Sequence, residues 1–244
     1  MTDPSTPPSI TLEGEARIAG VPLFARLRLE LRAGQWTTLL GASGVGKTTL
    51  LRLVAGLDTG VEFTGSVTAH DGAPLAGRIA YMGQSDLLAP WLDVTGNVTL
   101  GARLRGVSPD MPRARDLIAR LGLTSNAHQR PHTLSGGQRQ RAALARTLME
   151  DRPVVLLDEP FSALDARMRA EMQELAGEML AGRTVLLVTH DPGEAARLSH
   201  RAYLMSRDDL SEMPLPATPP VRAFDAPETL EAQAALFRRL RSAA

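Results

Sequence analysis

The fold is decided by three consecutive runs of sequence: Trp36-Thr-Thr-Leu-Leu40, Gly41-Ala42-Ser43-Gly44-Val45-Gly46-Lys47-Thr48 and Thr48-Thr49-Leu-Leu-Arg-Leu-Val-Ala55. The first run is short and apolar, which predicts a buried strand, and the last predicts a helix. The loop between them matches G-x-x-x-x-G-K-[ST], in which glycines let backbone N–H groups turn inward around phosphates. A chance match in a glycine-rich turn is the alternative, and the strand–loop–helix order argues against it.

Lys47 is the only lysine of the chain, and the other 26 of its 27 basic residues are arginine. A compact ammonium reaches the β- and γ-phosphates of a nucleotide, where a planar guanidinium does not fit the same loop. The Thr48 hydroxyl is predicted to bind Mg²⁺, and the helix that begins here turns its positive dipole end toward the phosphates. The residues of this loop predicted to bind the nucleotide are Gly41, Ala42, Ser43, Gly44, Val45, Gly46, Lys47, Thr48 and Thr49.

Two carboxylates follow a second apolar run, Val154-Val-Leu-Leu-Asp158-Glu159-Pro160. A buried strand would deliver Asp158 to the carboxyl edge of a sheet beside the phosphate loop, where it can hold magnesium through water. Glu159 is then placed to polarise the water that attacks the γ-phosphate. Taken alone, the run is equally consistent with a strand that ends in an acidic turn.

Composition limits the class of protein. The chain has 244 residues, enough for one large domain or for one domain with an inserted lobe, and its net charge of 0 gives no sign of a nucleic-acid partner. The absence of cysteine excludes disulfides, zinc–thiolate sites and thiol catalysis. No apolar run reaches the ~20 residues of a membrane-spanning helix, and the first ten residues do not resemble a secretory signal. We therefore expect a soluble, cytoplasmic protein.

The fold class predicted from these patterns is α/β, with a phosphate-loop NTPase core and a mostly parallel sheet. Loose alternation between Ile10 and Leu31 predicts an N-terminal antiparallel β subdomain, and the apolar runs at Leu156 and Val185 predict parallel strands buried on both faces. The predicted organisation is a disordered start at 1–9, a nucleotide-binding α/β core at 10–91 and 151–205, an inserted α-helical lobe at 92–150, and a proline-rich tail with a terminal helix at 206–244. One face of that helix is predicted to carry Leu230, Ala234, Leu236, Phe237 and Leu240.

The most specific motif is Leu134-Ser135-Gly136-Gly137-Gln138, which is followed by the helix-forming run Arg139-Gln-Arg-Ala-Ala-Leu-Ala-Arg146. Ser135 is a good helix N-cap, and the two glycines allow close backbone approach to an anion. An ordinary capped helix is the alternative, but the motif lies between Lys47 and Asp158 in the chain. With its motifs in this order the chain resembles the nucleotide-binding subunits of ABC transporters, over residues 10–205.

That resemblance implies roles for further residues. Gln84 resembles the Q-loop glutamine, Asp165 belongs to a segment that resembles the D-loop, and His190 resembles the switch histidine near the γ-phosphate. The resemblance also implies ATP with Mg²⁺, and a head-to-tail homodimer in which the Ser135–Gln138 turn of one copy closes on the nucleotide held by Lys47 of the other. The implied roles are catalysis by Glu159, His190 and Gln84, metal binding by Thr48, Gln84 and Asp158, and nucleotide contact by Ser135, Gly136, Gly137, Gln138 and Asp165.

One position departs from the family pattern. The family stacks an aromatic side chain on adenine, from a place that falls near Ala16 to Ile18 in this chain, where no aromatic residue is present. Phe24 is nearby but is expected in the core. The departure puts base selectivity in question, so that GTP is a candidate substrate.

The segment Gln84-Ser-Asp-Leu-Leu-Ala-Pro-Trp91 indicates the subgroup. It resembles importers of nitrate, sulfonates, taurine and pyrimidine precursors, and we expect it to receive a short helix from a transmembrane permease. The plainer explanation is that Leu87, Leu88 and Trp91 belong to the core of the lobe. The run Thr147-Leu-Met-Glu-Asp-Arg-Pro153 is most similar to the branch for hydroxymethylpyrimidine, a thiamine precursor, whereas thiamine, nitrate, sulfonate or taurine import are the alternatives.

The function expected from this resemblance is the ATPase that energises an importer, bound at the cytoplasmic face of the inner or plasma membrane. Its expected partners are permease subunits and a solute-binding protein, without nucleic acid. A soluble ABC ATPase of translation or DNA repair is the alternative class, but it would show two cassettes, a basic surface or long coiled-coil inserts. A phosphate-loop kinase is a third possibility, and the motif at Leu134–Gln138 argues against it.

Overall fold

The computed structural model describes residues 6–242 and divides the chain into two compact units. The first, here called the α/β unit, comprises residues up to 79 together with 152–159 and 181 onward, and the second, the helical unit, comprises 80–151 and 160–180. The first five residues of the predicted disordered start lie outside the described residues. The chain just after them contacts the α/β unit, because the Thr184 hydroxyl donates a hydrogen bond to the Pro8 carbonyl at 2.8 Å.

Three antiparallel strands form one sheet of the α/β unit, as predicted. They are β1 (Ile10–Ile18), β2 (Val21–Leu31) and β4 (Glu62–Ala69), in the order β2-β1-β4. Burial alternates along the first seven residues of β1, the pattern of a strand with one face on a core. Where β1 and β4 pair at Gly14 and Gly65 there is no room for a side chain, since a Cβ on Gly65 would come within 2.1 Å of the Glu13 carbonyl oxygen.

A second, mostly parallel sheet forms the centre of the same unit. Within this unit its strands follow the order β6 (Val154–Asp158), β7 (Thr184–Val188), β3 (Trp36–Gly41), β8 (Arg201–Met205) and β9 (Leu210–Met213). Every residue of β3, β6 and β7 is buried, which explains why these strands read as continuous apolar runs. Because β6, β7 and β3 are parallel, their carboxyl ends meet at one edge.

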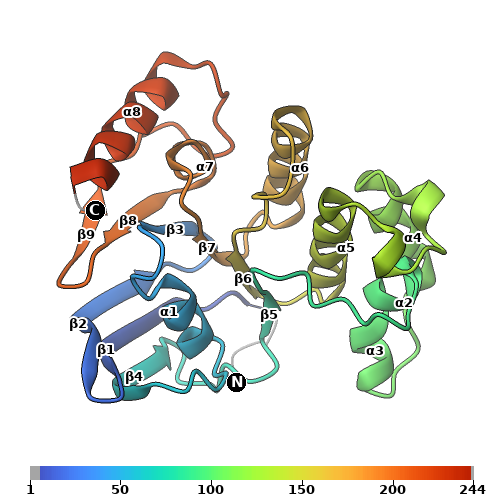
Figure 1. Cartoon of the computed structure of the whole chain (residues 1–244), viewed down its shortest axis with the longest axis horizontal. Coiled ribbons are helices and arrows are strands. Elements are labelled where there is room, and N and C mark those ends of the chain that lie inside the picture. Colours follow the sequence, from blue (N-terminus) through green and yellow to red (C-terminus); the bar gives the residue numbers. More distant parts are fainter. Residues whose placement is uncertain (1–5, 243–244) are drawn as a thin grey trace. The chain divides into compact units, whose positions relative to one another are not determined.

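The outer strand β9 lies inside the segment that the prolines had marked as irregular. It pairs antiparallel with β8, from Ala202 opposite Met213 to Met205 opposite Leu210. The strand is only four residues long and is followed directly by Pro214, which suits the edge of a sheet. The helices of this unit are α1 (Lys47–Val54), α7 (Pro192–Leu198) and α8 (Pro227–Ser242), the last running beside α7 (Figure 1).

Strand β5 (Ile79–Met82) leads from the α/β unit into the helical unit. The α-helices of the helical unit are α2 (Val94–Val98), α3 (Leu100–Leu104), α4 (Met111–Arg120), α5 (Gly136–Met149) and α6 (Ala166–Met179). Aspartates cap three of them: Asp93, Asp110 and Asp165 each accept a hydrogen bond from a backbone N–H of the first turn. Among residues 6–242, no helix is long and apolar enough to cross a membrane.

Candidate functional site

The loop from Gly41 to Lys47 joins β3 to α1 and wraps around the lysine that the sequence singled out. The Lys47 ammonium is buried and donates hydrogen bonds to the carbonyls of Gly41 and Ala42, at 2.8 and 2.9 Å. Gly44 and Gly46 have φ of 78° and 106°, a region that glycine enters without strain. The backbone of β8 is close, because a Cβ on Gly41 would lie 2.6 Å from the Met205 carbonyl oxygen.

The positive charge of Lys47 lies in an environment of low dielectric constant. Burial lowers the pKa of the ammonium, and the nearby carboxylates of Glu159 and Asp158 oppose that shift. A cation in such surroundings attracts an anion more strongly than it would in water. This loop is therefore suited to holding phosphates.

Asp158 ends β6 beside the phosphate loop, as predicted from its apolar strand. The residue is only 1% exposed, and neither carboxylate oxygen has a hydrogen-bond partner of good geometry. Burial raises the pKa of this carboxyl group and Glu159 adds to the increase, whereas the neighbouring Thr48 hydroxyl and Lys47 act to lower it. Burying this carboxylate without a partner costs free energy, and a bound cation would offset that cost.

These groups fit a magnesium ion better than most other metals. The Asp158 carboxylate and the Thr48 hydroxyl are hard oxygen donors, and Mg²⁺ is bound in nucleotide enzymes through one or two carboxylates together with substrate phosphates and water. Among the described residues there is no group of three or more His, Cys, Asp or Glu side chains that could hold a metal by themselves.

Glu159 and His190 come together at the carboxyl edge of the sheet. Oε1 of Glu159 lies 3.1 Å from Nδ1 of His190, and the Glu159 backbone N–H donates to the Val188 carbonyl at 2.8 Å. Glu159 has a φ of 50°, an uncommon value for a residue other than glycine, and such strain concentrates at functional sites. The α/β unit thus brings together five predicted site residues: Lys47, Thr48, Asp158, Glu159 and His190.

The other predicted residues belong to the helical unit. Gln84 is exposed just after β5. Ser135 and Gln138 form a capping box at the start of α5, in which the Ser135 N–H donates to Gln138 Oε1 at 2.7 Å and the Gln138 N–H donates to Ser135 Oγ at 3.2 Å. Asp165 caps α6 by accepting from the Met168 N–H at 2.9 Å. The side chains of Ser135, Gln138 and Asp165 therefore have local structural roles, and their nucleotide contacts stay predictions.

Sequence reasoning overlooked Gln140. Its side chain is buried, accepts a hydrogen bond from the Ala163 N–H at 2.8 Å and lies 3.2 Å from the Ser162 hydroxyl, to which its Nε2 donates. Gly137 lets the segment that contains Ala163 approach the helix closely, since a Cβ on Gly137 would lie 3.3 Å from the Ala163 carbonyl oxygen. Gln140 thus ties the helix after the glycine pair to the segment before Asp165. The available signal was a glutamine between arginines at a buried position of a helix.

The segment predicted to contact a permease is held firmly at the surface of the helical unit. Arg146 donates to the carbonyls of Leu87 and Asp86, at 2.6 and 2.8 Å, and Arg139 pairs with the Asp86 carboxylate at 3.0 Å. These contacts come from α5, the helix that begins at the glycine pair. Leu87 is exposed, and Trp91 is 71% exposed, so that these two are not lobe core, whereas Leu88 is buried.

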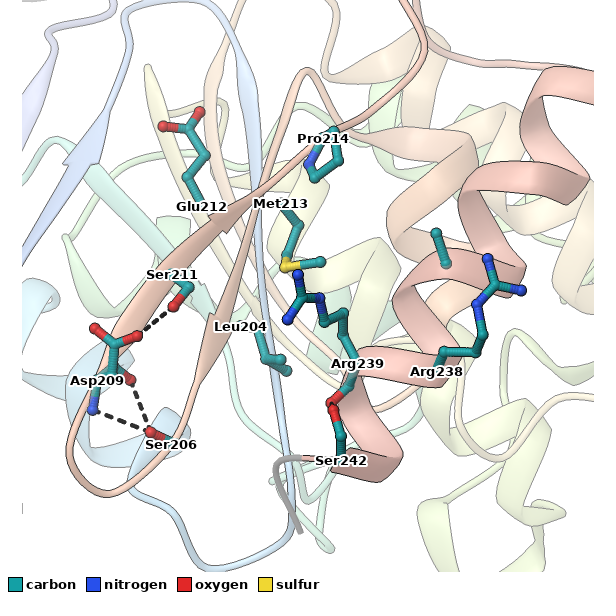
Figure 2. Close-up of a pocket in the computed structure, with 11 residues that line it drawn as sticks. Leu204, Ser206, Asp209, Ser211, Glu212, Met213, Pro214, Arg238, Arg239 and Ser242 are labelled. Atoms are coloured by element: carbon teal, nitrogen blue, oxygen red, sulfur yellow. Dashed lines mark hydrogen bonds between the residues drawn. The ribbon is translucent and has the colours of Figure 1, made fainter.

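A cavity of about 650 Å³ lies away from the predicted site residues, between the β8–β9 hairpin and α8. Figure 2 shows Arg239 turned toward Met213 in this cavity, whereas the neighbouring Arg238 points away from β9. The acidic side chains at its edge already have partners, because Glu212 pairs with Arg201 at 2.7 Å and Asp209 contacts Ser211. The cavity holds none of the predicted site residues.

Comparison with known proteins shows the family. The profile of a family described as ABC transporter matches residues 24–162. The chain is similar to the aliphatic sulfonates import ATP-binding protein SsuB of Delftia acidovorans, with 39% identity over 243 residues that cover 98% of this chain and 97% of that protein. It is also similar to the taurine import ATP-binding protein TauB of Yersinia pestis bv. Antiqua, with 41% identity over 198 residues that cover 78% and 76% of the two chains.

Solved structures agree on the fold. A dimeric structure of MJ0796, described as a bacterial ABC transporter cassette, has a TM-score of 0.76 and 26% identity, and covers 86% of this chain and 100% of that one. A post-hydrolysis state of the same cassette, bound to ADP and Pi, has a TM-score of 0.75. The predicted fold class is confirmed: an α/β cassette with a mostly parallel sheet, an N-terminal antiparallel sheet and helices.

Proposed function

The chain belongs to the ABC transporter family of ATP-binding proteins, and on that premise we propose that it is the ATP-hydrolysing subunit of a membrane importer for small sulfonates such as taurine. The solute class rests on relatives that are named for the import of aliphatic sulfonates and taurine. The hydroxymethylpyrimidine branch remains a prediction that these relatives do not support. Nitrate and thiamine remain alternatives, to be tested by the same uptake measurement with those two solutes.

The observation that carries the catalytic part is the constellation of Lys47, Asp158, Glu159 and His190 in the α/β unit. Lys47 and the loop N–H groups bind the β- and γ-phosphates of ATP. Thr48 and Asp158 would hold Mg²⁺, which neutralises charge on the phosphates when bound, and Gln84 stays a predicted ligand. The Glu159 carboxylate accepts the proton of the attacking water, and His190, 3.1 Å away, orients that carboxylate and reaches the γ-phosphate.

Two copies are proposed to work head to tail. The start of α5 presents backbone N–H groups at Gly136 and Gly137, which can contact the γ-phosphate of a nucleotide held by Lys47 of the second copy. Gln140 contacts Ser162 and Ala163, in the segment just before Asp165, and is proposed to position that segment. Support comes from the similar cassette MJ0796, whose structure is dimeric.

The partner in the membrane is proposed to be a permease that docks on the segment from Asp86 to Trp91. Its exposed Leu87 and Trp91 are an apolar anchor of the type that interfaces bury, and Arg139 and Arg146 hold the segment against α5. Movement at this segment would reach the glycine pair through α5. On this proposal the chain is peripheral, at the cytoplasmic face of the membrane, and a solute-binding protein delivers the sulfonate on the far side.

The test is uptake of labelled taurine, a short alkanesulfonate and hydroxymethylpyrimidine in cells whose own copy is replaced by the native chain or by Lys47→Ala. We expect sulfonate uptake with the native chain and its loss in the variant at equal protein level. Uptake of hydroxymethylpyrimidine alone would transfer the proposal to that branch. Uptake of all three that Lys47→Ala leaves unchanged would overturn the import role.

A further inference from the structure

Helix α8 carries an apolar stripe on its exposed side. Leu230 and Phe237 are 50% and 52% exposed, and the small residue Ala234 lies between them. The spacing of four and three residues puts all three on one face. Together with Pro192 and Gln233 they line a shallow groove of about 390 Å³.

This stripe is not the face that attaches α8 to the α/β unit. The attached face consists of Thr229, Ala232 and Leu236, and the last two pack in a buried cluster with residues of α7, β8 and β9. The prediction of one apolar face was therefore wrong: Leu236 is buried, whereas Leu230 and Phe237 point outward. Two apolar faces on one helix imply two contacts, and the described residues account for only one.

The charges of α8 are separated along its axis. Glu228 and Glu231 stand in its first half, and Arg238, Arg239 and Arg241 stand in its last turns. Glu231 and Arg238 are seven residues apart, beside the apolar stripe, and neither forms a hydrogen bond or ion pair with another described residue. Figure 2 shows that Arg238 points away from β9.

We propose that α8 pairs with the α8 of a second copy of this chain, antiparallel and around a two-fold axis. Antiparallel pairing brings the acidic half of each helix against the basic half of the other. Glu231 of each copy then faces Arg238 of the other, so that the symmetric contact contains this ion pair twice. Ala234 allows the two helices to approach closely, and Phe237 of one copy covers Ala234 of the other.

This contact goes beyond the ATP-dependent dimer of the proposed function. Helix α8 lies outside residues 24–162, the part that matches the family, and it contains none of the predicted nucleotide contacts. The pairing is therefore expected without nucleotide and in the Lys47→Ala variant. A result that rules out the ATP-dependent dimer therefore leaves the α8 pairing unaffected, and the reverse also holds.

The first test is sedimentation velocity of the full chain without nucleotide, up to about 100 µM, a range in which weak dimers dissociate measurably. We expect a concentration-dependent dimer, and Phe237→Glu should raise its dissociation constant by at least about tenfold, because it places a charge in an apolar contact. The matched control is Phe224→Glu, which changes a similarly exposed phenylalanine before α8 and should leave the dimer unchanged. Circular dichroism checks that both variants fold.

The second test is a charge exchange. Glu231→Arg or Arg238→Glu alone should weaken the dimer about threefold to tenfold, since each turns two attractive pairs into repulsive ones. The double variant should return to within about twofold of the native chain, because the pairs reform with their signs reversed. A merely structural role of either residue would not give this rescue.

Three results would overturn the proposal. The native chain could remain monomeric at every concentration, the double variant could be weaker than either single one, or Phe237→Glu could leave the dimer intact. Flotation with anionic lipid vesicles is run in parallel. Vesicle binding by a monomer, lost in Phe237→Glu, would assign the stripe to the membrane surface instead.

Discussion

The Nδ1 atom of His190 lies 3.1 Å from a carboxylate oxygen of Glu159, although the two residues are far apart in the sequence. They meet because β6 and β7 are neighbours in parallel register, with Asp158 opposite Val188, and each residue follows the end of its strand. The left-handed backbone of Glu159 turns its side chain at this point. On the proposed function, Glu159 is the base and His190 is the group that orients it.

Glu159→Gln should slow hydrolysis by about 10²- to 10⁴-fold, because an amide cannot take the proton of the attacking water. Binding of ATP should be retained, since Lys47 and the loop are unchanged. Steady-state phosphate release measures the loss of hydrolysis, and a nucleotide-binding titration measures the retained binding of ATP. Light scattering with ATP should show accumulated dimer. Hydrolysis at the native rate would remove Glu159 from the role of base.

Asp158→Asn should make the protein without ligands more stable while abolishing hydrolysis that depends on magnesium. The carboxylate is buried without a hydrogen-bond partner of good geometry, so neutralising it removes a desolvation cost, which the Thr48 hydroxyl and Lys47 compensate only in part. We expect a rise in Tm of about 2–4 °C, the shift that 1 kcal/mol gives in a chain of this size. Asp116→Asn, on the exposed side of α4, is the matched control. A fall in Tm would mean that the pair with Lys47 outweighs desolvation.

The gain from Asp158→Asn should depend on pH. The pKa of Asp158 is raised in the folded protein above its usual value near 3.8. At pH values between these two pKa values, Asp158 is protonated in a larger fraction of folded molecules than of unfolded ones. In that window the native chain loses stability as the pH rises. The Tm difference between variant and native chain should therefore be complete above the raised pKa and shrink toward pH 3.8, which thermal melts in a series of buffers measure. A constant difference would contradict the titration of Asp158.

Two substitutions at Ser135 should separate its capping role from its nucleotide contact. Ser135→Ala removes the cap of α5 and should cost about 1 kcal/mol of stability. Ser135→Asp keeps a good cap but places a negative charge at the predicted phosphate contact, so it should preserve Tm and lower ATPase activity about tenfold or more. Thermal melts and ATPase rates at one temperature test both. Full activity in Ser135→Asp would contradict the head-to-tail site.

Trp91→Ala should leave folding and the ATPase activity of the isolated chain within error, because the side chain is largely exposed and substitutions at such positions change stability by about 0.5 kcal/mol or less. Transport should fall about tenfold or more if the side chain anchors the permease, as buried aromatic anchors do. Phe224→Ala is the matched control, since Phe224 is 68% exposed and belongs to the α/β unit. Equal uptake by both variants would rule out the docking role of Trp91.

GTP should be hydrolysed with a kcat/KM within about tenfold of the value for ATP, because apolar contacts distinguish bases weakly. Ala16 is buried and Ile18 is 48% exposed at the tip of the β1–β2 hairpin, while Phe24 is core, as predicted. Ile18→Tyr should tighten binding of both nucleotides by about 1–3 kcal/mol through stacking. A preference for ATP above about a hundredfold in the native chain would show that other groups read the base.

Much of this protein was predictable from local sequence. Glycine content, burial and periodicity, which depend on residues close in the chain, predict the phosphate loop with its flanking strand and helix. They also predict the buried strand before Asp158. Helix α5 and its serine cap follow for the same reason, since a cap bonds the first turn of its own helix. Strand β9 was not predicted, because its only support is pairing with β8 and the flanking prolines indicated a loop.

The sequence by itself determined the chemistry: one lysine in a glycine loop, two carboxylates after an apolar strand, and a capped glycine pair before a helix. Only the tertiary structure decided that His190 contacts Glu159, that Gln140 ties α5 to the segment before Asp165, and that the apolar residues of α8 divide between a buried and an exposed face. Each of these depends on which strands and helices are neighbours. That choice is made by packing between residues distant in the chain, which no local pattern encodes.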